Sequence, residues 1–544
     1  MKRIFKYIVP ATAIALFMGT TSCTSDLDVT PISPKLTTEG SVTGLFNKCY
    51  SSLAMAGIGD GGSGDGGVDV TGYDDPGMTG LIRQMWNSNE LTTDEAICSW
   101  GDDGIPQFNF NSYDDAEPMC KAYFSRIALS ISYCNHYLET YGDYDATMTA
   151  EVRFVRALHY YLMMDAFGNI PFSETVSKPI QLTRTEAFNW LEKELLEIEP
   201  LLADAKAKVS TDEGYGRADK AAVWMLLMRL YLNAAVYTGE AKWTEAAQYA
   251  QKVIGSSYKL NEVSSNGWSP YQMLFMGDNG ETDAAYECVF PIIQDSKLTA
   301  SYGNSTFLTQ SCFNADMFAN PNDPDMTNGL TSAWSGNRAR PDLVKLFNTN
   351  NYTEEEMQVP SYAMTELLGD DRALFWGQDR TLDIESYDQY KQGFAVAKFV
   401  AFHTDGTTSY NNSFSDADWF LFRVAEAYLT IAECDARQHN GTTTTTGDNA
   451  INKLRQRANN YNQKSGYTLS EICDEWGREF YFEGRRRTDL IRFNRFGGSN
   501  NYSWTWKGGV KKNGSFEAYK NIFAIPANEL VSNGNLKQNP GYIK

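Results

Sequence analysis

The chain has 544 residues and carries 68 acidic against 47 basic side chains, for a formal net charge of −21. This excess of negative charge, with no basic stripe to offset it, argues against binding to nucleic acid. None of the nine cysteines forms a C-x-x-C pair, which argues against zinc ribbons and thioredoxin-type redox sites. The length allows one large domain or two ordinary ones.

Residues 1–22 have the pattern of an export signal. Basic residues open the segment, an apolar run follows over 8–18, and small residues lead to Cys23. The end of this segment resembles a bacterial lipobox, although Thr20 stands where leucine is usual. We therefore predict that Cys23 is lipidated and becomes the first residue of the mature chain. The alternative is an ordinary signal peptide followed by an incidental cysteine.

Lipidation would anchor the protein through several acyl chains, which is stable where a single chain is marginal. The polar, acidic residues 24–28 resemble the signals that send lipoproteins of the Bacteroidetes to the outer face of the outer membrane. No later segment reaches 18 uninterrupted apolar residues. We therefore expect a protein at the cell surface, attached to the outer membrane by its lipid alone.

A first helix is expected over 37–54, and residues 57–80 after it are too rich in glycine for regular structure. The spacing of Gly62, Gly64 and Gly67 matches a dinucleotide fingerprint by letter only, because no strand precedes it and no helix opens from it. A single Gly/Asp copy is also not a calcium-binding array. We interpret the segment as a surface loop near a binding face and predict no metal, while the sequence leaves open whether this acidic loop holds one.

The apolar run at residues 151–172 is the centre of the predicted fold. Polar side chains interrupt it at so few positions that a helix here should be buried on most of its faces. Gly168 supplies a C-terminal cap, and Pro171 prevents the helix from resuming. The interrupting residues are Glu151, Arg153, Arg156, His159 and Asp165.

Amphipathic spacing predicts further helices on both sides of this run. Thr183 with Glu186, and Thr468 with Glu471, form capping boxes that start two of them. The predicted helices lie at 91–99, 119–141, 183–202, 216–237, 243–254, 419–437, 448–459 and 469–480. Small alanines at the crossing points indicate stacked helical hairpins, and the part around 214–260 resembles a tetratricopeptide (TPR) unit.

Residues 261–418 differ from the helical parts. They are rich in Asn, Gly, Asp, Thr and aromatic residues, with short strand-like pieces at 286–293 and 394–402. We interpret this region as a long insertion of loops and small elements that packs on the helices, and not as an independent domain.

Several segments, taken in order along the chain, resemble the SusD/RagB family of outer-membrane nutrient-binding lipoproteins. They span nearly the whole mature chain, and a lipoprotein signal stands in front of them. The matching segments are 151–172, 216–260, 338–347, 370–372, 423–433, 478–492 and 525–542.

The resemblance implies a mainly all-α fold in a single SusD-like domain over 23–544. Four TPR-like hairpins, at about 37–260 and 415–497, would form a scaffold. An irregular, loop-rich region, at about 261–414 and 498–544, would present the ligand. Such proteins cap a SusC-like TonB-dependent transporter and hand it a glycan or, in some branches, a peptide.

We find no signature of catalysis. The four histidines fall in unrelated contexts, and neither H-E-x-x-H nor G-x-S-x-G occurs. Some carboxylate pair will always lie at glycosidase spacing among 68 acids, so such a pair carries no weight. We interpret the charged residues of the family motifs as ion pairs between packed helices. They are Glu151, Arg153 and Arg156 and the charges of the run 483–489. We therefore predict a protein that is not an enzyme and needs no cofactor.

Sugars are recognised by aromatic faces that stack on pyranose rings and by planar polar side chains that bond to hydroxyl groups. Large aromatic residues in polar loops are therefore the candidates for ligand contact. They are Tyr73, Trp100, Trp268, Tyr302 and Trp334. For each of them the alternative is a loop anchor tucked into the core.

Three functions are weighed. The first is a glycan-binding surface lipoprotein that delivers oligosaccharide or polysaccharide to a SusC-like transporter. The second keeps this role with a peptide or another nutrient as ligand. The third is a plain TPR scaffold that binds a protein partner, against which the lipid anchor and the long aromatic insertion argue.

Overall fold

The structure is a computed structural model that describes residues 41–59, 64–75, 77–317 and 327–542. The predicted export signal and Cys23 lie outside the described residues. By its internal contacts the chain divides into two units, Met1–Leu45 and Phe46–Lys544, and the second holds nearly all of the described residues. In the described part of the chain, no helix combines the length and the apolar character needed to cross a membrane.

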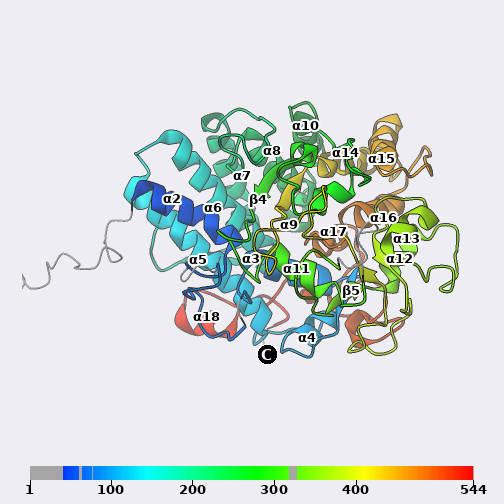
Figure 1. Ribbon diagram of the computed structural model, residues 1–544. Helices are drawn as coiled ribbons and strands as arrows, with labels where there is room; N and C mark the ends of the chain where they lie inside the picture. Colours follow the sequence, from blue (N-terminus) through cyan, green and yellow to red (C-terminus); the bar gives the residue numbers. More distant parts are fainter. Residues whose placement is uncertain (1–40, 60–63, 76, 318–326, 543–544) are drawn as a thin grey trace, which may run out of the picture. The chain divides into compact units, whose positions relative to one another are not determined.

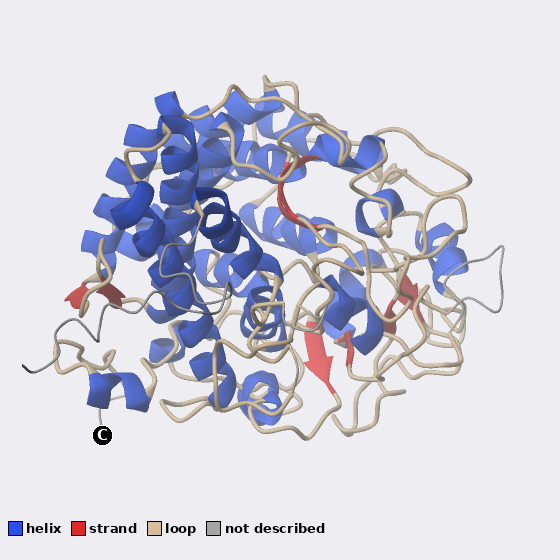
Figure 2. Cartoon of the chain, turned by 60° about the vertical axis from the view of Figure 1, so that its left-hand side comes forward, coloured by secondary structure: helices blue, strands red, loops and turns tan. Residues whose placement is uncertain are grey.

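Most of the secondary structure is helical, which confirms the predicted fold class. Figure 2 shows the helices of the described chain in blue. The longer ones are α2 (Val42–Ala54, which contains the division between the units), α5 (Pro118–Tyr141), α6 (Ala146–Phe167), α7 (Arg184–Ile198), α8 (Lys220–Leu232), α10 (Trp243–Ile254), α14 (Ala425–Gln438), α15 (Thr445–Arg457) and α16 (Leu469–Phe480).

These helices pack in sequence, as Figure 1 shows. Helix α5 packs against α6, α6 against α7, α8 against α10, and α14 against α15 and α16. The contact of α10 with α14 joins the early helices to the late ones across the long insertion between them. Antiparallel neighbours joined by short turns are compatible with the predicted TPR-like hairpins.

The apolar run predicted as the centre of the fold is α6. Asp145 caps it, with its side chain accepting a hydrogen bond from the Met148 amide, so the helix begins five residues before Glu151. It ends at Phe167, where Gly168 takes φ 71°, as its sequence position predicted. From Ala150 to Phe167 every side chain except that of Arg153 is buried. The helix is therefore enclosed on nearly all of its faces.

The charged residues of α6 form ion pairs with neighbouring segments, which confirms their structural interpretation. Glu151 lies 2.6 Å from an Nη atom of Arg217. Arg153 and Arg156 share the carboxylate of Glu194 on α7, at 2.6 and 2.9 Å. Because Glu151, Arg156 and Glu194 are buried, losing the partner of one of them would leave an uncompensated charge in the interior.

A larger buried network joins α16 to the rest of the unit. The Glu479 carboxylate lies 2.6 Å from Arg423 and 3.1 Å from Arg372, and it also pairs with Arg457. Burial by itself would raise the pKa of Glu479, but Arg457, Arg423 and Arg372 lower it to about 2. The sequence interpretation of the run 483–489 as an ion network is confirmed in the same region, where Arg486 pairs with a buried aspartate.

Short elements connect the helices and fill the loop-rich part of the unit. The helical ones are α3 (Leu81–Trp86), the π-turn η3 (Asn87–Leu91), α4 (Ile105–Asn109), η4 (Glu199–Leu201), α9 (Ala234–Thr238), η5 (Gln272–Phe275), η6 (Asp283–Glu287), α11 (Ser305–Ser311), α12 (Pro341–Phe347), α13 (Ser361–Leu368), α17 (Arg486–Arg492), η7 (Lys507–Gly509), η8 (Ala518–Asn521) and α18 (Ala527–Ser532).

The strands form four antiparallel two-stranded ladders among the described residues. They are β1 (Ala96–Cys98) with β5 (Asn337–Ala339), β2 (Ile170–Phe172) with β3 (Ile180–Leu182), β4 (Cys288–Ile292) with β8 (Trp419–Arg423), and β6 (Phe375–Trp376) with β7 (Ala395–Val396).

Two predicted helices are wrong because short buried strands occupy part of their range. The helix predicted over 91–99 lies upstream, in α3 and η3, and β1 follows it. The helix predicted over 419–437 begins only at Ala425, because 419–423 pair with β4 as β8. Both strands are buried at every position and, apart from Arg423, apolar, and periodicity alone does not distinguish such runs from buried helix.

Candidate functional site

The ladder between β1 and β5 brings two of the predicted aromatic residues together. Cys98 pairs with Asn337, and beyond this pair the Ser99 amide donates to the Gly336 carbonyl at 3.0 Å. Trp100 lies two residues after the end of β1, and Trp334 lies three residues before the start of β5 on the opposite strand. Continued antiparallel register places Trp100 opposite Ser335, so Trp334, the neighbouring residue, comes close to Trp100 although the two lie far apart in the sequence.

The two indoles are held by specific contacts. Their ring centroids lie 6.3 Å apart at an interplanar angle of 50°. Trp100 Nε1 donates to the Trp334 carbonyl at 3.2 Å, which fixes the orientation of the first ring. Gly336 leaves the space that this ring occupies, because a Cβ atom there would lie only 2.5 Å from Cζ2 of Trp100.

Tyr302 extends the row of rings. Its ring centroid lies 5.6 Å from that of Trp334 and 4.8 Å from that of Phe414. The backbone of this tyrosine is held by Asp65, whose carboxylate accepts from the Tyr302 amide at 2.8 Å and from the Ser301 hydroxyl at 2.5 Å. Trp100, Trp334 and Tyr302 form the aromatic row, and each is partly exposed.

The glycine-rich segment is a wall of this site. Its glycines allow close approach to the loop that carries Tyr302: a Cβ at position 64 would lie 2.6 Å from the Ala300 carbonyl oxygen, and one at position 80 would lie 2.5 Å from Cα of Gly303. The described part of 57–80 contains no helix and no strand, as predicted. Asp65 in this segment orders Tyr302. The described residues contain no group of three or more His, Cys, Asp or Glu side chains placed to hold a metal ion.

A cavity of about 780 Å³, here called the aromatic cavity, opens beside the row. Tyr73, Trp100 and Trp334 line it, together with Met119 from the start of α5. The Tyr73 hydroxyl donates to the Pro118 carbonyl at 3.3 Å, and burial raises the pKa of this tyrosine to about 12. Three aromatic rings that line one hollow suit a ligand with flat apolar faces.

Arg83 and four aspartates, Asp74, Asp75, Asp102 and Asp103, supply the charged groups of the aromatic cavity. Arg83 Nη2 lies 2.5 Å from Asp75 Oδ2, and its guanidinium lies 4.9 Å from the ring centroid of Phe307. Arg83 Nε is buried and has no hydrogen-bond partner among the described residues. Half of the Asp75 side chain is exposed. This pair offers donors and acceptors next to the rings, which is the combination that binds sugar hydroxyl groups.

Trp268 lies apart from the other four predicted residues. It is only 7% exposed and its ring centroid lies 5.3 Å from that of Phe402. It lines a different cavity of about 490 Å³, together with Tyr362 of α13. The structure thus brings Tyr73, Trp100, Tyr302 and Trp334 into one region and places Trp268 elsewhere.

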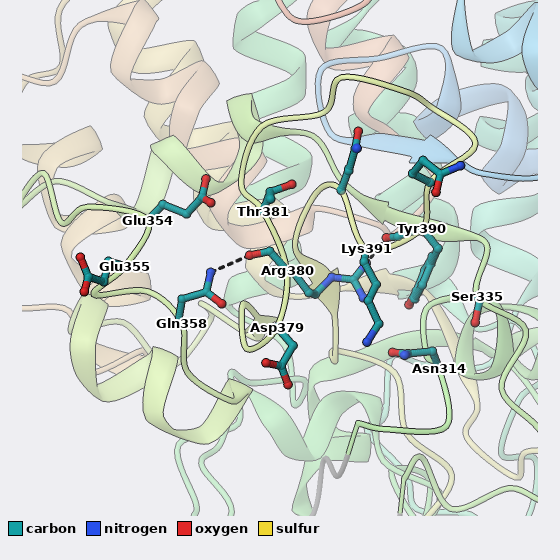
Figure 3. Close-up of a pocket in the computed structure, with 12 residues that line it drawn as sticks. Asn314, Ser335, Glu354, Glu355, Gln358, Asp379, Arg380, Thr381, Tyr390 and Lys391 are labelled. Atoms are coloured by element: carbon teal, nitrogen blue, oxygen red, sulfur yellow. Dashed lines mark hydrogen bonds between the residues drawn. The ribbon is translucent and has the colours of Figure 1, made fainter.

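Sequence reasoning missed three contributors to this region. Arg83 lies on α3, a helix too short for its periodicity to stand out, and Asp75 and Gly336 lie in loops. A second hollow of about 830 Å³, here called the polar cavity, was not predicted at all (Figure 3). Its lining is almost wholly polar, so the search for aromatic residues in loops could not find it.

Comparisons with known proteins identify the family. A model of the SusD family matches residues 369–542. The starch-binding protein SusD of Bacteroides thetaiotaomicron is 37% identical over 578 aligned residues, which cover 99% of each chain. The chain belongs to the SusD family. Members of this family bind carbohydrate and are not catalytic, so membership confirms that the protein is not an enzyme and implies an outer-membrane-associated place at the cell surface.

Solved structures of SusD-like proteins share the fold. Surface glycan-binding protein A from Bacteroides uniformis superposes with a TM-score of 0.65 at 19% identity, over 92% of this chain and 99% of that one. Surface glycan-binding protein A from Bacteroides thetaiotaomicron, solved in complex with laminarihexaose, gives a TM-score of 0.63 at 17% identity, over 92% of this chain and 98% of that one.

Proposed function

We propose that this SusD-family protein captures an α-glucan of the starch type at the cell surface and delivers it to a SusC-like TonB-dependent transporter. The aromatic row of Trp100, Trp334 and Tyr302 supports glycan binding most directly, because three partly exposed rings offer successive stacking faces beside a cavity with free polar groups. The choice of α-glucan follows the relative that is 37% identical over 99% of each chain, which is a starch-binding protein.

The roles of the residues follow from their positions. Trp100 and Trp334 would stack on sugar rings, Tyr302 would extend the platform, and Tyr73 would close the opposite wall. Arg83 Nε would donate to a sugar hydroxyl, which also satisfies a buried donor that is otherwise without a partner among the described residues. Binding energy would come from several modest contacts, so each ring should matter separately.

Isothermal titration of the mature protein against a glycan panel tests this proposal. The panel contains maltotriose, longer malto-oligosaccharides, laminarihexaose and a mixed peptide digest. Wild-type protein should bind the malto-oligosaccharides, and Trp100→Ala and Trp334→Ala should each weaken binding at least tenfold, which is about 1.4 kcal/mol. Tyr144→Ala serves as the matched control, because Tyr144 is 66% exposed and lines neither cavity.

The possible results separate the parts of the proposal. Unchanged affinity in both tryptophan variants would refute the proposed binding site but not the role in glycan capture. Binding of laminarihexaose alone would replace the α-glucan by a β-glucan. Binding of the peptide digest alone would favour the second function weighed from the sequence, in which a peptide is the ligand.

The lipid anchor and the transporter are separate parts of the proposal. Cys23 stands where lipidation would occur, and a Cys23→Ala variant expressed in the native host should leave the outer-membrane fraction and become soluble or secreted. Detergent extraction of the wild-type protein should co-purify a large β-barrel protein. Recovery of the protein without any such barrel would contradict the proposed delivery.

A further inference from the structure

The polar cavity, shown in Figure 3, shares a segment of chain with the aromatic cavity. Trp334 lines the aromatic cavity and Ser335, the next residue, lines the polar cavity. Consecutive Cα atoms are only about 3.8 Å apart, so the walls of the two cavities meet at this peptide. The segment is held in place, because the amides of Trp334 and Ser335 donate to the Gln310 and Phe313 carbonyls at 2.7 and 2.9 Å.

The charges around the polar cavity nearly cancel. Glu354, Glu355 and Asp379 contribute carboxylates, and Arg380 and Lys391 contribute cations. An anion-binding site would need an excess of positive charge, and a cation site would need carboxylates without competing cations. A lining of amides and near-balanced charges suits a neutral ligand with many hydroxyl groups.

Arg380 carries a donor that the described part of the protein does not use. The side chain is only 5% exposed, its Nε donates to the Gly393 carbonyl at 2.8 Å, and its Nη2 donates to the Tyr390 carbonyl. The guanidinium lies 4.2 Å from the ring centroid of Tyr390, a contact visible in Figure 3. Its Nη1 has no partner among the described residues. A rigid buried cation with one open donor is prepared for a ligand oxygen.

Asn314 carries the matching acceptor. Its Oδ1 is buried and has no hydrogen-bond partner in the described part of the chain, and the residue lines the same cavity. A buried acceptor without a partner costs about 1–3 kcal/mol, a cost that a ligand hydroxyl would remove. A hydroxyl group can donate to Asn314 Oδ1, and another can accept from Arg380 Nη1. Both partners that a sugar needs are therefore present.

We propose that the polar cavity is a second contact region for the same glycan chain. A neutral oligosaccharide stacked on Trp100 and Trp334 would continue past Ser335 and place hydroxyl groups against Asn314 Oδ1 and Arg380 Nη1. This inference rests on the proposed function, and it adds that the protein selects longer chains over short ones. The aromatic row provides stacking, and the polar cavity provides the hydrogen bonds of the extension.

Titration of the mature protein with maltotriose and with maltodecaose tests this inference. The variants are Asn314→Leu, which removes the open acceptor, and Arg380→Lys, which removes Nη1 and keeps the charge. Affinity for maltodecaose should fall at least fivefold in each, whereas affinity for maltotriose should change less than twofold. Asn528→Leu is the matched control, since Asn528 is exposed and lines neither cavity.

A longer chain also has more ways to occupy the aromatic cavity. The deciding quantity is therefore the maltodecaose affinity of wild type relative to Asn314→Leu, and not the ratio between the two ligands. Asn314→Leu keeps the test valid if Arg380→Lys fails to fold, because the Asn314 oxygen has no partner among the described residues to lose.

The failures of the two proposals can be distinguished. If wild type binds maltotriose and Asn314→Leu loses no affinity for maltodecaose, the second contact region is refuted and the proposed function stands. If wild type binds neither malto-oligosaccharide, both the proposed function and the second contact region are refuted. Equal losses for both ligands in Asn314→Leu would also refute it, because the variant would then act on the first site.

Discussion

Gly336 controls the orientation of Trp100, and replacing it with alanine should disable the site while leaving the fold intact. A Cβ at this position would lie 2.5 Å from Cζ2 and 2.8 Å from Nε1 of the indole. Ordinary contacts between such atoms are about 3.5–4.0 Å, so the ring must move by roughly 1 Å. The hydrogen bond from Nε1 to the Trp334 carbonyl, 3.2 Å long, would then be lost or distorted.

The size of the effect can be estimated from these contacts. A neutral hydrogen bond contributes about 0.5–1.5 kcal/mol to stability, and Trp100 is only partly buried, so unfolding should become easier by about 1 kcal/mol. Binding should suffer more, because a stacking face displaced by roughly 1 Å no longer matches its ligand. We expect the affinity for malto-oligosaccharides to fall at least tenfold, about 1.4 kcal/mol.

Gly101→Ala is the matched control for this variant. Gly101 is next to Trp100, and a Cβ there would have no neighbour within 4 Å. Titration calorimetry and urea unfolding of both variants should show lost affinity in Gly336→Ala and near wild-type behaviour in Gly101→Ala. Equal affinities for Gly336→Ala and wild type would refute the claim that the position of this indole decides binding. A large loss of stability in Gly336→Ala would mean that the ring is a core residue.

Three further predictions concern stability and chemistry. Glu479→Gln should lower the free energy of unfolding by about 3–5 kcal/mol, because it removes the carboxylate that three buried arginines share. The pKa of Glu479 in the folded protein is about 2, so its contribution to the free energy of unfolding is complete above the ordinary glutamate pKa of 4.5 and disappears as pH falls towards 2. Urea unfolding between these two pH values should therefore show a shallower pH dependence in the variant than in wild type. Thr468→Ala removes the side-chain cap of α16 and should cost about 1 kcal/mol in the same assay, whereas Ser470→Ala, inside the first turn, should cost less. The eight described cysteines are free and buried, and burial raises the pKa of Cys98 and Cys473 to about 12. These thiols should therefore react with Ellman's reagent only after unfolding. Rapid reaction of the folded protein would contradict their burial.

Helices with local signals could be predicted from the sequence with close boundaries. Helix α10 matches its predicted range, and α5 begins one residue before its own. The two capping boxes, at Thr183 and Thr468, start helices as expected. Such signals work because a helix closes its hydrogen bonds within a few residues, so its sequence contains most of the information that forms it.

The strand-like pieces expected at 286–293 and 394–402 contain β4 and β7, but two other strands with distant partners could not be predicted. Residues 96–98 and 419–422 are apolar runs without alternation, and each lies in a strand that pairs with a partner far along the chain. Only the completed fold supplies those partners. A break inside a helix could not be predicted either. The single helix predicted over 216–237 divides at Asn233 into α8 and α9, and no glycine or proline marks the break.

The sequence by itself determined the family, the helical class and the kinds of residue that would meet a ligand, because motifs, periodicity and polar loops with aromatic residues are local properties. Tertiary structure alone decided which of these residues act together. Trp100 and Trp334 meet because β1 pairs with β5, while Trp268, in an equally polar loop, packs on Phe402. The polar cavity has no local signal. Asn314 becomes unusual only when burial leaves its Oδ1 without a partner among the described residues, and Arg380 only when the fold holds its Nε and Nη2 but not its Nη1. Chain folding brings distant segments to within a few ångströms, and a binding site is a property of that proximity.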